Sequence, residues 1–401
     1  MENLRHFYLY SRYNSVDIKY KLGMPDYSYK FVENYFCKSL SRLGKVTEVS
    51  TVDELPADFS EHEFLFVFEP PHEIPSGYAR WAIPVFAWEY SSIPDEVLGG
   101  EERLDWKNVL TSVRGAVTHS SFTVKSMEDA GIDVPKTYIL APLFDQFSIF
   151  ADVPKSRLWS LPFEGLYWDS KEKVGTGAGR TAQSELSFSE VVYTYVFNPV
   201  DGRKRWEDAV SAFVFTHRKN CDAVFVLKLI NKNEEKSLRT VRAFINRLGD
   251  FECRLVIICG FLADEDFGEL VRGTDFAVNT SCGEGQCLPL IEFMSAGTPS
   301  VSPRHTAMAD YVNSSNSLVV EHSWNLSSWP NDPLKKYRCF NYPVKWESLV
   351  AMFTSSYQLI TESPEDYRSM SVAAYETMKN QCSQEVVEKS LLKFIESLSP
   401  K

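Results

Sequence analysis

The chain alternates between short apolar runs and stretches of helical periodicity, and it does so in two separate blocks. In the first block the strand-like runs are 4–10, 45–50, 63–69, 83–88, 115–120 and 137–142. Between the first two runs, apolar residues recur at helical spacing over 27–43, and Gly44 follows as a stop signal. Strands that alternate with helices predict a parallel sheet covered by helices.

The second block repeats this pattern more cleanly. Its strand-like runs are 191–197, 223–230, 253–260, 275–281, 299–302 and 317–320. The helical patterns that separate them are 203–217, 234–248, 264–271 and 288–296. We therefore predict an α/β protein of two doubly wound, Rossmann-like domains that face a central cleft, where ligands bind at strand ends and helix N-termini.

The boundaries of these domains follow from changes in composition. Residues 146–189 interrupt the rhythm, and their second half is rich in Gly, Ser and Lys, which predicts a linker or excursion. From residue 346 the pattern predicts two or three amphipathic helices, and we expect the last one to return to the first domain. The expected parts are a first domain of 1–145 completed by about 380–401, the linker of 146–189, and a second domain of 190–379.

The charge of the chain argues against one broad class of function. Acidic residues outnumber basic ones by 54 to 42, and the net charge of −12 disfavours a protein that coats nucleic acid. No run of about 18 apolar residues predicts a membrane-spanning helix, and the first residues lack the apolar core of a signal peptide. We expect a cytoplasmic protein and leave open a peripheral contact with the inner face of a membrane; the oligomeric state is not predicted.

The cysteines and acidic residues predict no metal or cofactor. The eight cysteines form no C-x-x-C pair and no cluster with histidine, so we expect reduced thiols, several of them buried. Asp201 and Asp208 have no partner at metal-ligand spacing.

The most informative stretch is CGEGQCLPLIEFMSAGTPSV at 282–301, which follows a predicted strand and opens a predicted helix. Glu284 lies in the loop, and Glu292 lies eight positions further on, about one turn into the helix. Free backbone N–H groups near Cys287 and Leu288 would point into the cleft, where an anionic pyrophosphate fits. The loop carboxylate could then accept hydrogen bonds from sugar hydroxyls and the helix carboxylate from a ribose diol, in charge-assisted contacts.

This stretch resembles the E-x7-E motif of the retaining family-4 glycosyltransferases, which have the GT-B fold. The usual family wording is E-G-F-G-L-P-x-x-E-A-M-x-x-G-T-P-V-V, and here it reads E-G-Q-C-L-P-L-I-E-F-M-S-A-G-T-P-S-V. The spacing, Pro289, Met294 and the Gly-Thr-Pro of 297–299 all agree.

The resemblance extends beyond the motif. Residues 260–281 resemble the family's helix near the nucleotide base and its next strand, and residues 197–213 resemble its phosphate loop. A weaker resemblance is present in the first domain, at 70–94 and 117–132. Together, the resembling regions cover about three quarters of the chain.

The resemblance implies a role for each matching residue. Glu292 matches the glutamate that binds the ribose, and Glu284 matches the one that contacts the donor sugar near the reacting face. Lys204, helped by Arg203, falls where the family's lysine holds the diphosphate. The remaining donor-side positions are Asn198, Gly283, Gly285, Gln286, Cys287, Leu288 and Phe261.

The sequence also departs from the family pattern. Asn198 stands where the family has an arginine, so one cation is missing. Gln286 and Cys287 replace the usual aromatic residue and glycine, and the side chain of Cys287 narrows the site. These departures concern turnover more than fold.

Each donor-side residue also has an ordinary structural explanation. Glu284 could be a solvated loop residue, and Glu292 could be a residue near the start of a helix that the helix dipole favours. The surrounding L-P and A-G-T-P favour the motif instead. Lys204 and Arg203 are compatible with solvated helix-start residues, although cations are unfavourable there and so favour a ligand.

Candidates for the acceptor side lie at predicted strand ends of the first domain. Trp88 and Glu89 end a strand that faces the predicted cleft, and Trp88 is either a platform for a sugar ring or a core residue. His119 is either a cleft residue near the acceptor or a histidine capped by neighbouring backbone. His72 and Glu73 lie in a loop after Pro70 and Pro71, where they are either functional loop residues or ordinary structural ones. In the second domain, Arg304 and His305 follow the strand after the motif helix and either line the cleft or are structural.

The resemblance implies metal-independent transfer of a hexose from a UDP- or GDP-sugar, with retained anomeric configuration, to a hydroxyl of a glycan or lipid-linked glycan. Bacterial surface polysaccharide assembly is the family's usual setting. Lys204, Arg203 and the amides of 285–288 would stabilise charge on the leaving diphosphate. Two alternatives stay open. The first is a GT-B sugar-nucleotide epimerase or phosphorylase. The second is a non-catalytic family member that binds a nucleotide or glycan, and the absence of the family's arginine at Asn198 is the reason to retain it.

Overall fold

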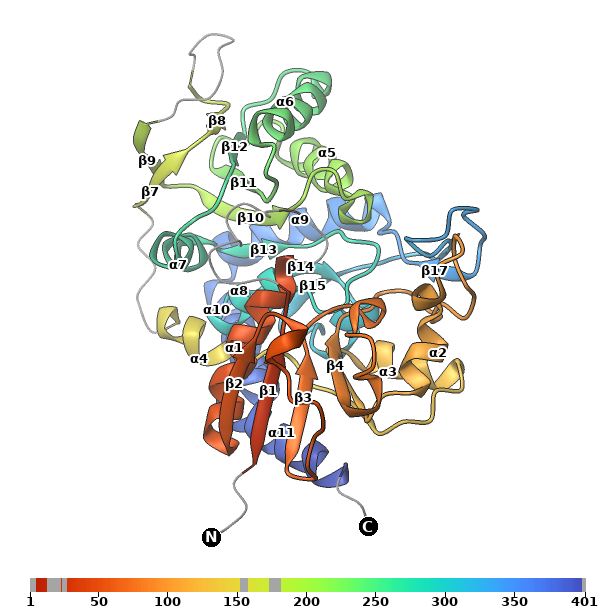
Figure 1. Ribbon diagram of the computed structural model, residues 1–401. Coiled ribbons are helices and arrows are strands. Elements are labelled where there is room, and N and C mark those ends of the chain that lie inside the picture. The colour runs from red at the N-terminus through yellow and green to blue at the C-terminus, as the bar shows by residue number, and fades with distance from the viewer. Residues whose placement is uncertain (1–4, 13–22, 24–26, 152–157, 173–181, 399–401) are drawn as a thin grey trace.

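The computed structural model describes residues 5–12, 23, 27–151, 158–172 and 182–398. Two α/β domains, one above the other in Figure 1, are joined by long helices near the C-terminus. The strands of the first domain are β1 (His6–Tyr10), β2 (Lys45–Val49), β3 (Glu63–Val67), β4 (Ala82–Phe86), β5 (Ala116–Thr118) and β6 (Lys136–Tyr138). Its helices are α1 (Tyr27–Leu43), α2 (Trp106–Thr111), α3 (Ser121–Asp129) and α4 (Phe144–Phe147). All six strands are parallel, in the order β2-β1-β3-β4-β5-β6.

The second domain has a larger sheet, in the order β15-β14-β13-β10-β11-β12-β8. Its parallel strands are β10 (Val191–Phe197), β11 (Ala223–Leu229), β12 (Arg254–Ile258), β13 (Phe276–Val278), β14 (Ser300–Pro303) and β15 (Ser317–Val320). Its helices are α5 (Trp206–His217), α6 (Glu234–Ile245), α7 (Asp264–Gly273), α8 (Leu288–Ser295), α9 (Trp346–Glu362) and α10 (Pro364–Cys382). The expected pair of doubly wound domains is thereby confirmed.

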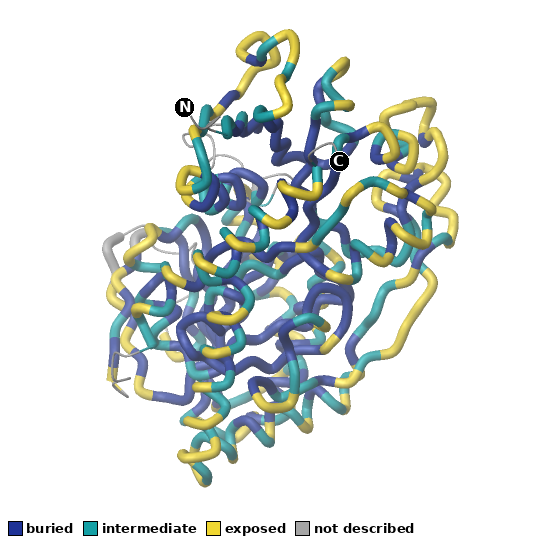
Figure 2. Tube along the Cα trace, turned by 90° about the horizontal axis from the view of Figure 1, so that it is seen from below, coloured by how far each residue is buried: buried dark blue, intermediate teal, exposed yellow. Residues whose placement is uncertain are grey.

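Helices cover both faces of the second sheet, and the central strand β10 shows how the sequence specifies this. Tyr193 and Tyr195 pack in one buried cluster with α5 and α9, whereas Val192 and Val196 pack in another with α8. Successive side chains of a strand point to opposite faces, so a continuous apolar run is what a sheet buried on both faces requires. Figure 2 shows this buried interior in dark blue beneath an exposed shell.

The last helix, α11 (Gln384–Ser397), returns to the first domain as expected. It packs beside α1, where Gln384 Nε2 donates to Ser39 Oγ at 2.7 Å and Arg42 pairs with Glu388 at 3.0 Å. Buried Leu391 and Phe394 join the core of the first domain. The chain therefore crosses between the domains twice, and its end closes the first one.

The stretch expected as a linker or excursion, residues 146–189, contains three strands among its described residues. β8 (Tyr167–Asp169) pairs antiparallel with β12, and β7 (Trp159–Gly165) pairs with β9 (Ala182–Phe188) in a separate two-stranded sheet. Most of the Gly-rich part of the stretch lies outside the described residues. The described part therefore carries strands of its own, which the sequence pattern did not predict, and β8 extends the sheet of the second domain.

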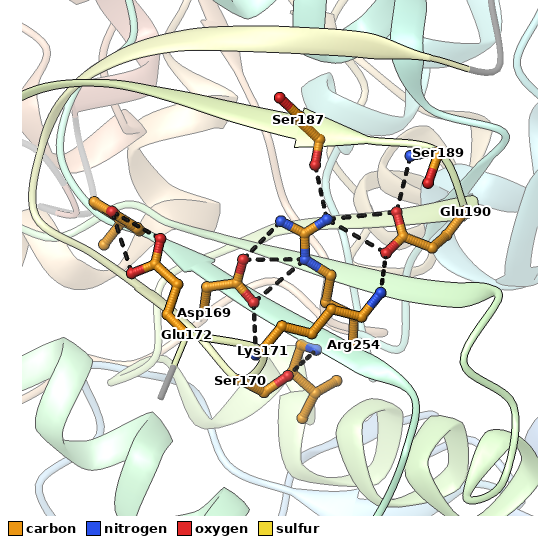
Figure 3. Close-up of polar contacts among 10 residues, drawn as sticks. Asp169, Ser170, Lys171, Glu172, Ser187, Ser189, Glu190 and Arg254 are labelled. Carbon is orange, nitrogen blue, oxygen red and sulfur yellow. Dashed lines mark hydrogen bonds and ion pairs between the residues drawn. The ribbon is translucent and has the colours of Figure 1, made fainter. Parts of the chain in front are cut away.

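A buried ion cluster fastens β8 to the domain, as Figure 3 shows. The guanidinium of Arg254 on β12 lies between Asp169, at 2.6 Å, and Glu190, at 3.3 Å, and it also donates to the carbonyl of Ser187 at 2.7 Å. Lys171 reaches Glu190 at 2.5 Å. Because every charge in this cluster has an opposite partner, the edge of the sheet is held by charge-assisted bonds as well as by the ladder.

A second unexpected element lies between β15 and α9. There β16 (Asn325–Ser327) and β17 (Cys339–Asn341) form an antiparallel pair at the edge of the molecule (Figure 1). The connecting loop lies against the first domain, where Trp329 packs in a cluster with Trp88 and Trp106.

Candidate active site

Two loops of the second domain meet where β10 and β13 end. The first loop, 198–205, is tied down through backbone contacts: Tyr195 Oη and Thr280 Oγ1 both donate to the carbonyl of Lys204, at 2.5 and 2.9 Å. Asp201 accepts from the backbone N–H of Arg203 at 3.0 Å. The loop ends at Arg205 in the left-handed region (φ 49°), directly before α5. These bonds fix the direction of the Lys204 side chain.

The second loop carries the motif. The backbone N–H of Glu284 donates to Thr306 Oγ1 at 3.0 Å, and its carbonyl accepts from Ala307 N at 3.1 Å. Tyr311 Oη donates to the carbonyl of Gln286 at 2.9 Å. Cys287 caps α8 at φ 65°, in the conformation that favours the glycine usual at this position.

Lys204 and Glu284 form the centre of the site. Lys204 Nζ lies 2.5 Å from Glu284 Oε1, and both side chains are mostly buried. Burial raises the pKa of Glu284, but the charges of Lys204 and Arg203 outweigh it, and the net shift is downward. Burial lowers the pKa of Lys204, and Glu284 more than reverses that shift. The pair therefore stays ionised at neutral pH.

Arg203 connects this centre to the first domain. Its guanidinium pairs with Glu89, which follows β4, and with Asp201 at 3.0 Å. The first domain also presses on the motif loop, because a Cβ at Gly285 would lie 2.6 Å from Ala87 Cβ and 2.9 Å from the backbone N of Trp88. The glycine is required for this closeness of the two domains.

Glu292 lies one turn into α8, partly exposed. Burial, followed by the charge of Asp264 at the start of α7, raises the pKa of Glu292 to about 8. Tyr35 of α1 lies close to the same two carboxylates, and burial together with the charges of Glu292 and Asp264 raises the pKa of Tyr35 as well. Helices from both domains therefore surround this carboxyl group.

A small cavity extends from the ion pair under the start of α8. Lys204, Glu284 and Cys287 line one part of it, and residues of β10 and β13 line another.

The remaining donor-side candidates differ in position. Phe261 follows β12, and the carbonyl of Gly260 before it accepts a hydrogen bond from the buried Lys228. Asn198 is engaged elsewhere: its Nδ2 donates to the carbonyl of Gly23 at 2.9 Å and its Oδ1 accepts from Asn231 at 2.9 Å. Asn198 therefore joins the two domains instead of presenting a free polar group to the cavity.

The acceptor-side candidates do not converge on the cavity. The ring of Trp88 is buried against Trp106 and donates to the carbonyl of Ser92 at 2.9 Å, so it is a core residue and not an open platform. His72 stacks on Trp106 and accepts from its Nε1 at 3.2 Å. Only Glu89 reaches the site, through Arg203.

The two other histidines are buried. His119 Nδ1 donates to the carbonyl of Ile139 at 2.8 Å, its Nε2 has no hydrogen-bond partner among the described residues, and burial lowers its pKa to about 4. His305 stacks on Tyr342, and burial lowers its pKa to about 3, whereas the neighbouring Arg304 is exposed. Both histidines are neutral at pH 7.

Residues that orient the site were not among the sequence candidates. Tyr195, Thr280, Thr306 and Tyr311 hold the two loops through bonds to backbone atoms. The signal available for them is weak. Tyr195 and Thr280 lie in predicted strands, whereas Thr306 and Tyr311 lie in a predicted connection, and many structural residues occupy such places.

The described residues show neither a metal-ion cluster nor a membrane-spanning helix. No group of three or more His, Cys, Asp or Glu side chains in the described part of the chain could hold a metal ion. None of the described helices is long and apolar enough to cross a membrane. All eight cysteines are free thiols, five of them buried.

The two facing domains, with a lysine–carboxylate pair where the second-domain loops meet, define a protein of the GT-B class. Residues 197–326, which contain both loops, match the family model described as Glycosyl transferases group 1. The match covers the phosphate-loop and motif regions together. No curated protein matches the chain.

Solved structures agree with this fold along most of the chain. Anabaena Alr3699/HepE in complex with UDP has a TM-score of 0.58 at 11% identity, covering 98% of this chain and 100% of that one. Sucrose-phosphate synthase from Thermosynechococcus elongatus has a TM-score of 0.57 at 12% identity, covering 98% and 99%.

A third structure is a longer protein. S. aureus TarM, in complex with Fondaparinux, alpha-GlcNAc-glycerol and UDP, has a TM-score of 0.52 at 11% identity and covers 84% of this chain. The chain spans just over half of its length, 56%. These likenesses confirm the GT-B fold, and with the family match they support a glycosyltransferase.

Proposed function

We propose that the protein is a retaining, metal-independent glycosyltransferase. It moves a hexose from a UDP- or GDP-sugar to a hydroxyl of a glycan or lipid-linked glycan, in the assembly of a surface polysaccharide. The observation that carries the proposal is the meeting of Lys204 and Glu284 at 2.5 Å at the start of α8, with Glu292 one turn further along that helix.

The charges of the site suit a leaving diphosphate. When the bond from the sugar to the diphosphate breaks, negative charge grows on the phosphate oxygens. Lys204, Arg203 and the backbone N–H groups at the start of α8 are the donors for that charge, and one well-placed donor contributes about 3–4 kcal/mol to the transition state. Glu284 then faces the hydroxyls of the donor sugar.

Donor binding requires an exchange of partners. In this structure both cations are paired with carboxylates, Lys204 with Glu284 and Arg203 with Glu89 and Asp201. A diphosphate must take over at least one of these cations, and its charge repels Glu89. Because Glu89 belongs to the first domain, a small separation of the domains would free Arg203 for the phosphate.

The choice of nucleotide rests on the structural likenesses. Alr3699/HepE and TarM are described in complex with UDP. This supports a UDP-sugar rather than a GDP-sugar as the donor. Phe261, in the loop that follows β12, is the residue that we assign to the base.

Turnover with defined stereochemistry tests the proposal. Purified protein is screened with UDP- and GDP-hexoses and soluble oligosaccharide acceptors, with and without a chelator, and the new linkage is assigned by proton NMR. An α-linked product from an α-linked donor, unaffected by the chelator, is expected. An inverted product, or activity that is lost with the chelator, contradicts the retaining or the metal-independent part.

A second candidate is a non-catalytic protein that binds a nucleotide or glycan. The contacts of Asn198 favour it, because this residue supplies no cation to the phosphates and is tied to Gly23 and Asn231. Binding of UDP without turnover of any UDP- or GDP-hexose would favour this candidate. A donor converted without an acceptor would instead indicate an epimerase.

A further inference from the structure

The segment between β15 and α9 carries a dense group of exposed apolar side chains. Five of the thirteen large apolar side chains exposed in the described chain fall within residues 324–340. We call them the docking face: Trp324, Leu326, Leu334, Tyr337 and Phe340. Leu334 and Tyr337 are 72% and 73% exposed, although burying such side chains is normally favourable.

The strand pair turns part of this face outward. Leu326 lies opposite Phe340 in the register, and the rings of Trp324 and Phe340 meet at 5.3 Å. Because side chains alternate along a strand, these three lie on one side, whereas Cys339 points to the other side and is buried.

Contacts with the first domain hold the inner side of the segment. Ser91 Oγ accepts from the backbone N–H of Phe340 at 2.9 Å, and Ser92 Oγ donates to the carbonyl of Arg338 at 2.8 Å. Trp329 Nε1 donates to Ser92 Oγ at 3.1 Å. The docking face is therefore presented on a fixed support at the edge of the molecule (Figure 1).

Within residues 324–340 the exposed charges are basic, although the chain as a whole carries −12. Glu321, before β16, is also exposed, but it is paired with Lys345 at 2.8 Å. Lys335 and Lys336 are exposed, and the one acidic residue between them and β16, Asp332, is buried and accepts from two backbone N–H groups. The nearby Glu96 of the first domain is paired with Arg338, at 2.7 Å, and with Lys336, at 3.7 Å. Within the described residues Lys335 forms no ion pair.

We infer that the docking face binds the surface of an anionic lipid bilayer. Trp and Tyr favour the interface between headgroups and acyl chains, and lysines beside them are attracted to anionic headgroups. The two exposed leucines favour a bilayer over a glycan, because aliphatic side chains gain most from acyl chains. This surface would place the cleft beside a lipid-linked acceptor, but the docking itself does not depend on the proposed transfer reaction.

Co-sedimentation of the full chain with lipid vesicles tests the inference without donor or acceptor. The vesicles are phosphatidylcholine alone, or phosphatidylcholine with about one third phosphatidylglycerol. The variants are Leu334→Ser/Tyr337→Ser and Lys335→Gln/Lys336→Gln, all at exposed loop positions. The matched control, Ile149→Ser/Val372→Ser, removes two apolar side chains elsewhere that are 64% and 55% exposed.

We expect the wild type and the control to sediment with the anionic vesicles and more weakly with phosphatidylcholine. Each lysine removed should weaken binding by roughly fivefold, and the Leu334/Tyr337 variant should weaken it by roughly tenfold or more. Unchanged melting temperatures show that the variants are folded.

Three results would overturn the inference: no binding by the wild type, binding by both variants that is as tight as that of the wild type, or loss of binding in the control. Light scattering that shows a dimer lost in the Leu334/Tyr337 variant, without vesicle binding, would assign the face to a second copy instead. Because no sugar donor is present, none of these results bears on the transferase proposal.

Discussion

At the scale of single residues, the account depends on Lys204, Glu284 and Glu292. The charges of Lys204 and Glu284 neutralise each other, and both side chains are mostly buried, so the ionised form of each is stabilised by the other. Removing one partner of a buried pair leaves an uncompensated charge, whereas removing both does not. Comparing single with double variants of Lys204 and Glu284 therefore separates their contribution to stability from their contribution to ligand binding.

Replacing Lys204 by alanine should reduce kcat at least about 100-fold, because a main cation facing the diphosphate is lost. It should also destabilise the fold by about 3–5 kcal/mol, since Glu284 stays buried without a partner. The double variant Lys204→Met/Glu284→Gln should regain much of the stability and no activity. Kinetics and denaturant unfolding measure the two effects, and Lys345→Ala, an exposed lysine paired with Glu321, is the control.

Glu292 predicts a pH dependence of donor binding. With a pKa of about 8, its carboxyl is largely protonated at pH 7, whereas a ribose diol is best accepted by the ionised form. UDP affinity should therefore rise as the pH rises from 6 to about 9, and binding at pH 7 should release a proton. Calorimetry in buffers of different ionisation enthalpy measures this release, which Glu292→Gln should abolish.

The same carboxyl has the opposite effect on stability. Its folded-state pKa lies above the ordinary value of 4.5, so the folded protein binds the extra proton between these two values. Stability from this group is therefore lost as the pH rises toward 8.

Proton release on UDP binding that persists in Glu292→Gln would contradict the assignment of Glu292 to the ribose.

At the scale of elements, the ends of β10 and β13 carry the positioning residues. Tyr195 and Thr280 hold the carbonyl of Lys204, so the loop before α5 is oriented by bonds that the family motif does not include.

Tyr195→Phe should therefore lower kcat by about tenfold, because Lys204 loses one of its two backbone anchors, with a loss of about 1 kcal/mol in unfolding free energy. Tyr193→Phe is the matched control. This tyrosine is equally buried on the same strand, but its hydroxyl meets Ser356 at 2.9 Å, away from the loop. Equal activity losses in both variants would indicate a general effect of stability.

The elements differ in how far the sequence predicted them. The helix at 27–43 and the strand at 191–197 coincide with α1 and β10, because continuous apolar periodicity specifies them locally. The strand β8 was missed because its three residues are held by a partner far along the chain, through Asp169 and Arg254. The pair β16 and β17 was missed because each strand has only three residues, which is too short for an alternating pattern to be recognised.

The candidate site was predictable to a similar degree. The spacing of the motif predicted Glu284 and Glu292, and Lys204 followed from the resemblance. The role of Trp88 in the core depends on its packing against Trp106, which no local pattern reveals.

At the scale of the whole molecule, the two domains are closed over the site. Contacts between them include Arg203 with Glu89, Asn198 with Gly23, Arg338 with Glu96, and the backbone N–H of Ser121 with Asp310 at 2.8 Å. Ligand entry then requires these contacts to loosen.

Gly285→Ala should hold the domains apart, because the new Cβ would lie 2.6 Å from Ala87 Cβ. We expect turnover to fall by at least about tenfold, while UDP still binds to the second domain, and small-angle scattering should show a larger radius of gyration. Val372→Ala is the control, because Val372 is exposed on α10, outside both loops of the site. Normal turnover in Gly285→Ala would exclude a role for this contact.

The central claim is that Lys204, Glu284 and Glu292 together hold a nucleoside diphosphate. Calorimetric titration with UDP and GDP, on the wild type, the double variant Lys204→Met/Glu284→Gln, and Glu292→Gln, tests it most directly. The account predicts one site in the wild type, with affinity lost or reduced at least about tenfold in both variants and unchanged in Lys345→Ala. A wild type that binds neither nucleotide, or variants that bind as tightly as the wild type, would contradict it.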